Sequence, residues 1–288
     1  MAWYFPREGV APQPATKFPG SLVGSFATLP GATDTFLRQF MLASALGEVV
    51  AAIGRLRPVL WILRSMASDT QDETSTVSLL AVFEAASFLG VPIGFVTEKQ
   101  LQDGSVPNNE QNIVVIPNST FVENATVTAL QRRTRDSVFL ASNTTAMCLR
   151  FTPSGAMRPL QELAFLDNLT ALRVVPAPVM HSVLRAHLLP QLARPPAWCV
   201  EAAAPGEGPV FGVLCRFALV PEVGLVGMII NMNAQPLEVG VAMVRDGKVV
   251  AATHALELRT GTQVQFSNSG NLMRSGEVLV LQIIMDAT

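Results

Sequence analysis

Polar residues follow four short apolar runs in the first half of the chain, and their types could support chemistry. The runs are residues 58–63, 92–97, 112–117 and 137–141. If these runs are parallel strands, their carboxyl ends meet at one edge of a sheet, where open α/β sheets bind ligands. The side chains that this prediction assigns to a candidate ligand crevice are Ser65, Asp69, Glu98, Asn118, Ser142 and Asn143.

Sequence motifs for common cofactors and nucleophiles do not occur at these strand ends. No loop reads G-x-G-x-x-G or G-x-x-x-x-G-K-[ST], so the glycine turns that hold dinucleotides and phosphates are missing. The segment Ala141-Ser-Asn-Thr-Thr does not match the G-x-S-x-G turn that exposes a catalytic serine. We therefore expect no cofactor and no catalytic residue.

The histidines do not form a metal or catalytic pattern. His181 and His187 are six residues apart, which places them on different faces of a helix, and His254 stands alone. We expect ordinary surface or core-edge histidines and no metal site.

Carboxylates near the strand ends are the remaining candidates for acid/base work, because glycoside hydrolysis needs two of them close together. The acidic residues in question are Glu84, Glu98, Asp103 and Glu123. The spacing does not show which of them are neighbours. The favoured interpretation is that they are solvated loop charges, or a helix carboxylate that caps a polar contact.

The apolar runs alternate with helical patterns of about a dozen residues, such as 75–89 and 122–133. Continuous apolar strands separated by helices are typical of a sheet covered on both faces. An amphipathic helix beginning at Thr33 or Asp34 and ending at Gly54 precedes them. We predict an α/β fold with a doubly wound, mostly parallel sheet over residues 33–200.

Short alternating runs and turn residues replace this pattern after residue 200. Asp246-Gly247, between the runs 237–245 and 248–252, is typical of a two-residue hairpin turn. We predict a small antiparallel β domain over residues 201–288, joined by a proline-containing connector at 173–198. Residues 1–32 are rich in proline, glycine and aromatic residues. We predict that they form an irregular arm, whose aromatic side chains need another surface to pack against.

Composition narrows the class of partner. The chain of 288 residues is 49% hydrophobic and 15% charged, with a formal net charge of −2. The charge and the absence of a basic stripe argue against a nucleic-acid partner. The longest apolar stretches are too short for a transmembrane helix, and the first residues lack the pattern of a signal peptide.

Two further features of the sequence bear on whether the protein is exported, and neither decides it. Cys148, Cys199 and Cys215 form no C-x-x-C pair and are expected to be buried thiols. Four N-x-[ST] triplets are possible glycosylation sites, which have meaning only in an exported protein. They begin at Asn118, Asn124, Asn143 and Asn168.

Three segments of the α/β region resemble a known family. They are Phe88-Leu-Gly90, Phe95-Val-Thr-Glu98 and Ile116-Pro-Asn118. These segments resemble the domain that follows the catalytic barrel in glycoside hydrolase family 42 β-galactosidases. That trimerisation domain is similar to class I glutamine amidotransferases, and the downstream β region resembles the C-terminal β domain of these enzymes. The resemblance covers roughly residues 45–288.

The catalytic residues of neither family can be transferred to this sequence. The family 42 glutamates lie on a (β/α)₈ barrel, for which the sequence has no room before residue 33. Amidotransferases need a cysteine at a strand elbow, whereas residues 141–144 contain none and Cys148 comes too late.

The resemblance implies a non-catalytic structural or assembly subunit, or pseudoenzyme. Its expected partners are protein subunits, in a homo-oligomer such as a trimer or in a larger hetero-complex. The apolar excess fits a surface covered by other subunits. The alternatives are a β-galactosidase-like hydrolase fragment and a carbohydrate-binding protein.

Overall fold

The computed structural model describes twelve segments of the chain. These are residues 46–107, 112–133, 138–141, 147–172, 176–192, 199–204, 208–209, 211–220, 223–245, 248–251, 254–266 and 271–284. Helix α3 (Gly47–Gly54) comes first and ends at the glycine that the sequence indicated. The predicted arm and most of the predicted first helix lie outside the described residues.

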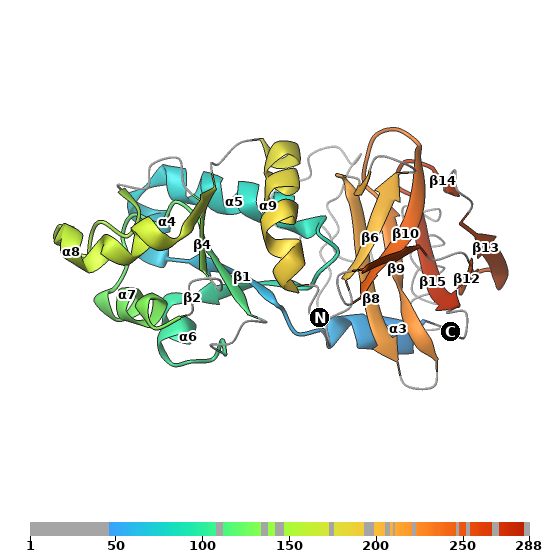
Figure 1. Cartoon of the computed structure of the whole chain (residues 1–288), viewed down its shortest axis with the longest axis horizontal. Coiled ribbons are helices and arrows are strands. Elements are labelled where there is room, and N and C mark those ends of the chain that lie inside the picture. Colours follow the sequence, from blue (N-terminus) through green and yellow to red (C-terminus); the bar gives the residue numbers. More distant parts are fainter. Residues whose placement is uncertain are drawn as a thin grey trace, which may run out of the picture. The chain divides into compact units, whose positions relative to one another are not determined.

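Five parallel strands form the first sheet, in the order β2-β1-β3-β4-β5. They are β1 (Leu60–Arg64), β2 (Ile93–Thr97), β3 (Ile113–Ile116), β4 (Val138–Ala141) and β5 (Thr170–Leu172). The helices of this region are α4 (Met66–Gln71), α5 (Glu73–Ser87), α6 (Glu98–Gln102), α7 (Asn124–Gln131), α8 (Leu160–Leu163), the 3₁₀ helix η3 (Ala164–Asn168) and α9 (Ala177–Leu192). The α/β fold class is confirmed (Figure 1).

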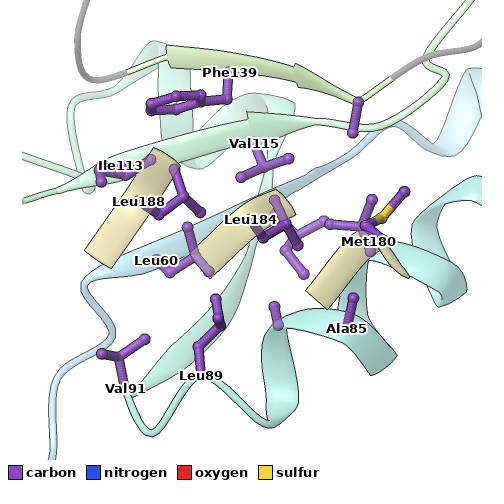
Figure 2. Close-up of a cluster of buried hydrophobic side chains, with 14 of the residues drawn as sticks. Leu60, Ala85, Leu89, Val91, Ile113, Val115, Phe139, Met180, Leu184 and Leu188 are labelled. Carbon is purple, nitrogen blue, oxygen red and sulfur yellow. The ribbon is translucent and has the colours of Figure 1, made fainter. Parts of the chain in front are cut away.

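Alternate residues of the strands point to two separate cores, as expected for a sheet covered on both faces. Ile113 and Val115 belong to a core that α5 and α9 complete with Ala85, Met180 and other side chains (Figure 2). Val114 and Ile116 belong to the other core, shared with α6, α7 and α8. This explains why every residue of β3 is buried.

Residues 65–74, whose polar composition predicts a loop after the first apolar run, are mostly helical. They contain α4 and the start of α5. The Ser65 side chain accepts a hydrogen bond from the Ser68 amide, and Asp72 does the same for Thr74, so each polar residue caps a helix. The apolar face of α4 is too short to give a helical period in the sequence.

Two antiparallel sheets make up the last third of the chain, as predicted. One has the order β11-β10-β6-β7, with β14 also paired to β10, and the other has the order β13-β12-β15-β9-β8. Their strands are β6 (Cys199–Ala204), β7 (Gly208–Pro209), β8 (Val213–Val220), β9 (Gly224–Asn231), β10 (Leu237–Arg245), β11 (Lys248–Ala251), β12 (His254–Glu257), β13 (Thr262–Gln265), β14 (Asn271–Met273) and β15 (Val278–Ile284).

The two antiparallel sheets share one hydrophobic core. Cys215 and Leu281 come from one sheet, and Val241 and Met273 come from the other. The predicted hairpin is also present, since Arg245 pairs with Lys248 across a two-residue connection. The turn residues themselves lie outside the described segments.

The described residues contain neither a membrane-spanning helix nor a cluster of metal ligands. No helix there combines the length and the apolar character that crossing a bilayer requires. No group of three or more histidine, cysteine, aspartate or glutamate side chains is arranged there to hold a metal ion.

Candidate functional site: the carboxyl edge of the parallel sheet

The strand order places the expected ligand crevice between β1 and β3. The chain proceeds outward in opposite directions from these two neighbouring strands, and doubly wound sheets bind ligands at this switch point, beyond the carboxyl ends of the strands. Ser65 follows β1, and the segment 117–121 follows β3. The hydrogen-bond partners of these two segments therefore show whether the crevice is open to a ligand.

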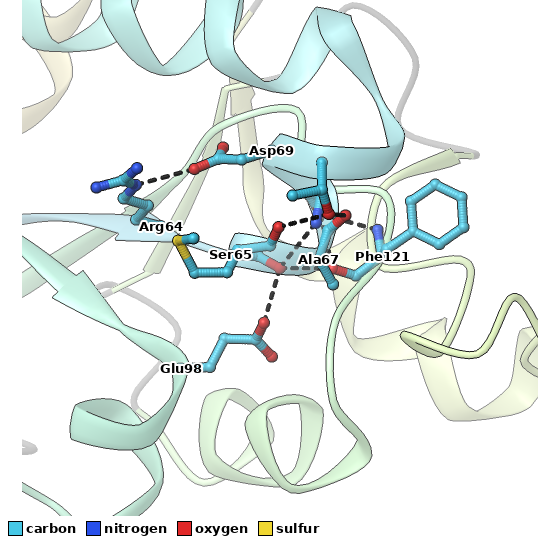
Figure 3. Close-up of polar contacts among 9 residues, drawn as sticks. Arg64, Ser65, Ala67, Asp69, Glu98 and Phe121 are labelled. Atoms are coloured by element: carbon cyan, nitrogen blue, oxygen red, sulfur yellow. Dashed lines mark hydrogen bonds and ion pairs between the residues drawn. The ribbon is translucent and has the colours of Figure 1, made fainter.

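Ser65 is buried, and its hydroxyl makes all of its hydrogen bonds within the protein. Its Oγ lies 2.7 Å from Glu98 Oε1 and 2.6 Å from the carbonyl oxygen of Phe121, and it accepts a hydrogen bond from the Ser68 amide (Figure 3). Only 1% of the residue is exposed. A hydroxyl in this setting caps a helix and joins two loops, and it cannot reach a substrate.

Ser68 holds the same peptide from the next turn of α4. Its Oγ donates to the Phe121 carbonyl over 2.6 Å and accepts from the Phe121 amide over 2.9 Å. These bonds bind the start of α4 directly to the segment after β3. The protein's own side chains therefore occupy the crevice at the switch point.

Glu98 closes the network from the side of β2. Besides the Ser65 hydroxyl, its carboxylate accepts the Glu123 amide over 2.7 Å and the Thr126 hydroxyl over 2.9 Å. The last two contacts lie at the beginning of α7, where the helix dipole favours a negative charge. Both oxygens of Glu98 thus have donors within the protein, as expected for a structural carboxylate.

Asp72 and Asn118 form a second group at the same edge. Asp72 accepts hydrogen bonds from the Thr120 hydroxyl at 2.5 Å and from the Thr74 hydroxyl at 2.6 Å. The side-chain nitrogen Nδ2 of Asn118 donates to the Thr74 hydroxyl over 2.6 Å. Burial raises the pKa of Asp72, but the hydrogen bonds from Thr120 and Thr74 outweigh it and leave the pKa below its usual value.

Asp69 does not take part in these networks. Its Oδ2 lies 2.9 Å from Arg64 Nε, and the Arg64 side chain is half exposed, so the pair is worth little stability. Ser142 and Asn143 lie outside the described residues. Ser65, Glu98 and Asn118 lie at the carboxyl edge of the sheet, where their polar groups bond within the protein.

A buried arginine that the sequence did not single out holds several segments together at this edge. Arg158 is 3% exposed and donates to Asn124 Oδ1 and to the carbonyls of Leu149, Phe151 and Val122. Burial lowers its pKa. An arginine between a methionine and a proline forms no recognisable motif, so only its tertiary partners reveal its role.

Two of the three cysteines are buried thiols, as predicted. Cys148 lies beneath the segment after β3, and burial raises the pKa of its thiol to about 12, which leaves it an inert neutral group. Cys215 is buried in the core shared by the two antiparallel sheets. The side chain of Cys199 lies outside the described residues.

Similarity to known proteins is confined to solved structures. No protein-family model and no curated protein matches the sequence. The apo exo-carrageenase GH42 from Bacteroides ovatus matches with a TM-score of 0.60 and 16% identity, over 85% of this chain and 31% of that chain. Gan42B, a GH42 β-galactosidase, matches with a TM-score of 0.50 and 11% identity, over 78% of this chain and 40% of that chain.

These matches show a shared fold at low identity. This chain spans less than half the length of either enzyme. An α/β region followed by antiparallel sheets is thus the architecture of part of a GH42 enzyme, and the chain has the fold of that part.

Proposed function

We propose that this chain is a non-catalytic structural or assembly subunit built from domains like the accessory part of a family 42 glycoside hydrolase. One observation carries the proposal: the crevice in which a doubly wound sheet binds its ligand is filled by Ser65, Ser68, Glu98 and the Phe121 peptide. The similarity to part of two GH42 enzymes supports it.

The edge of the sheet at β2 supports an assembly role. Among the described residues β2 pairs with β1 alone, and its five residues include no charge and no proline. Monomeric proteins usually protect an edge strand with such residues. Phe95, on β2, is 42% exposed and stacks on Phe83 of α5 with ring centroids 5.2 Å apart.

The outer face of α5 extends this apolar surface. Val77 and Leu80 are 63% and 56% exposed, one turn apart along the helix that carries Phe83. A second copy of the chain, pairing β2 with β2 and burying these side chains, is the partner that the unprotected edge favours.

The mass of the native particle tests this assignment. We expect light scattering after size exclusion, at micromolar concentration, to give a multiple of the 30.8 kDa chain mass. Leu80→Glu should shift the particle toward the monomer. Ala125→Glu is the control, because Ala125 is exposed on α7, which packs on the other face of the sheet, and this change should leave the mass unaltered. A wild-type monomer would refute assembly with a second copy.

Turnover separates the proposal from the enzymatic alternative. We expect no hydrolysis of an aryl β-galactoside by the purified chain. Activity that copurifies with the protein and is lost in Glu98→Gln or Glu123→Gln would refute a non-catalytic role. Saturable binding of a galactoside without hydrolysis would instead support a carbohydrate-binding protein.

A further inference from the structure

The three N-x-[ST] triplets in the described residues differ in how their asparagines are used. Asn118 is half-buried, whereas Asn124 and Asn168 are exposed. The fourth triplet, at Asn143, lies outside the described residues. A modification at these positions would therefore have different consequences for the fold.

The Asn118 triplet is part of the polar edge described above. Nδ2 of the Asn118 side chain donates to the Thr74 hydroxyl, and the Thr120 hydroxyl donates to Asp72. An N-linked glycan is attached through that same amide nitrogen. A glycan on Asn118 would thus need space beside Thr74, where the chain already makes a 2.6 Å contact.

Asn124 presents the opposite arrangement. It is the first residue of α7 and is exposed, and its Oδ1 accepts a hydrogen bond from Arg158 Nε over 3.0 Å. Glycan attachment uses Nδ2 and leaves Oδ1 as an acceptor. The contact that holds the buried Arg158 would therefore survive the modification.

We propose that Asn124 is an N-glycosylation site that the native fold accommodates, and that Asn118 is one that it excludes. The molecule that supplies the glycan is a lipid-linked oligosaccharide diphosphate. A bond forms between Asn124 Nδ2 and the anomeric carbon, the bond from that carbon to the diphosphate oxygen breaks, and Nδ2 loses one proton to a base of the transferase. Because transfer precedes complete folding, the fold then selects which modified chains persist.

The test uses the full chain, secreted from a eukaryotic host behind an added signal peptide. One variant keeps only the Asn124 triplet, and another keeps only the Asn118 triplet, with Asn124→Asp among its changes. Asp at 124 preserves an oxygen for Arg158, so it is a matched control for the loss of the glycan alone. The readouts are intact mass before and after enzymatic glycan removal and the thermal unfolding midpoint.

We expect the Asn124-only chain to be secreted with glycan mass and to unfold within about 2 °C of its deglycosylated form, a shift that corresponds to a small change in stability. The Asn118-only chain should be secreted without glycan or should be retained. An unmodified secreted Asn124-only chain would overturn the proposal. A glycosylated Asn118-only chain with unchanged stability would overturn it equally.

Discussion

Ser65 belongs to the hydrogen-bond network that closes the carboxyl edge of the parallel sheet. It caps α4, contacts Glu98 and contacts the Phe121 carbonyl, which are 33 and 56 residues away in the sequence. Its role is structural because each of its contacts is internal and 1% of the residue is exposed.

Ser65→Ala should lower the free energy of unfolding by about 2 kcal/mol, because it removes a helix cap and leaves buried acceptors without their donor. Urea denaturation would measure the change. Thr70→Ala is the control, since the Thr70 hydroxyl is exposed and donates only to carbonyls of its own helix. Equal effects of the two substitutions would contradict a special role for Ser65.

Glu257 gives a prediction for the dependence of stability on pH. The residue is 3% exposed and accepts hydrogen bonds from Arg259 Nε, Thr260 and the Val280 amide. Burial raises its pKa, but the hydrogen bonds and the Arg259 charge outweigh burial, so the pKa is lower in the folded state. Its stabilising contribution is therefore complete above the unfolded pKa of about 4.3 and is lost as the pH falls through the lower folded value.

Glu257→Gln should cost about 2 kcal/mol at pH 7, and the difference from the wild type should shrink as the pH falls below about 4. Unfolding curves at several pH values would show this convergence. A difference that grows on acidification would mean that the carboxylate is not stabilised in the folded state.

At the scale of elements, the contact between β8 and β9 depends on a glycine. A methyl group on Gly227 would lie 2.6 Å from the Phe217 ring and 2.7 Å from the Phe217 Cα atom. The two strands pair through Phe217 and Gly227 directly opposite each other. The Arg216 carbonyl oxygen lies closer still, so the approach of β9 to the backbone of β8 and to the Phe217 ring requires glycine.

Gly227→Ala should lower stability by about 1 to 3 kcal/mol through overpacking. Gly54→Ala is the matched change, because nothing lies within 4 Å of the added methyl group there. Thermal unfolding should place the Gly54 variant at or above the wild type. A neutral Gly227 variant would show that the strands can separate without cost.

Strands could be predicted from the sequence where burial on both faces requires apolar residues. The strands β1, β3 and β4 were evident as continuous apolar runs because both of their faces are covered. The apolar pattern did not predict α4, of six residues, or α6, of five residues. Each of these helices begins at a capping side chain and has no extended apolar face. Short helices of this kind carry no period to detect.

At the scale of the whole molecule, low net charge governs solution behaviour. With a formal charge of −2 and an isoelectric point near 5.9, the chain has little electrostatic repulsion at mildly acidic pH. Light scattering should show the most nonspecific association near pH 5.9 and less at about pH 8, where the net negative charge is larger. A particle mass that is independent of pH across this range would indicate that association is specific.

The sequence by itself determined the α/β region and the antiparallel region after it, and it placed Ser65, Glu98 and Asn118 directly after predicted strands. These follow from apolar patterns and strand direction, which are local properties. Only the tertiary structure decided that the edge is closed, because hydrogen bonds from Ser68 to Phe121, from Thr126 to Glu98 and from Arg158 to Val122 join segments far apart in the chain. Whether a polar residue is free to bind a ligand depends on its partners in space, which its position in the sequence does not reveal.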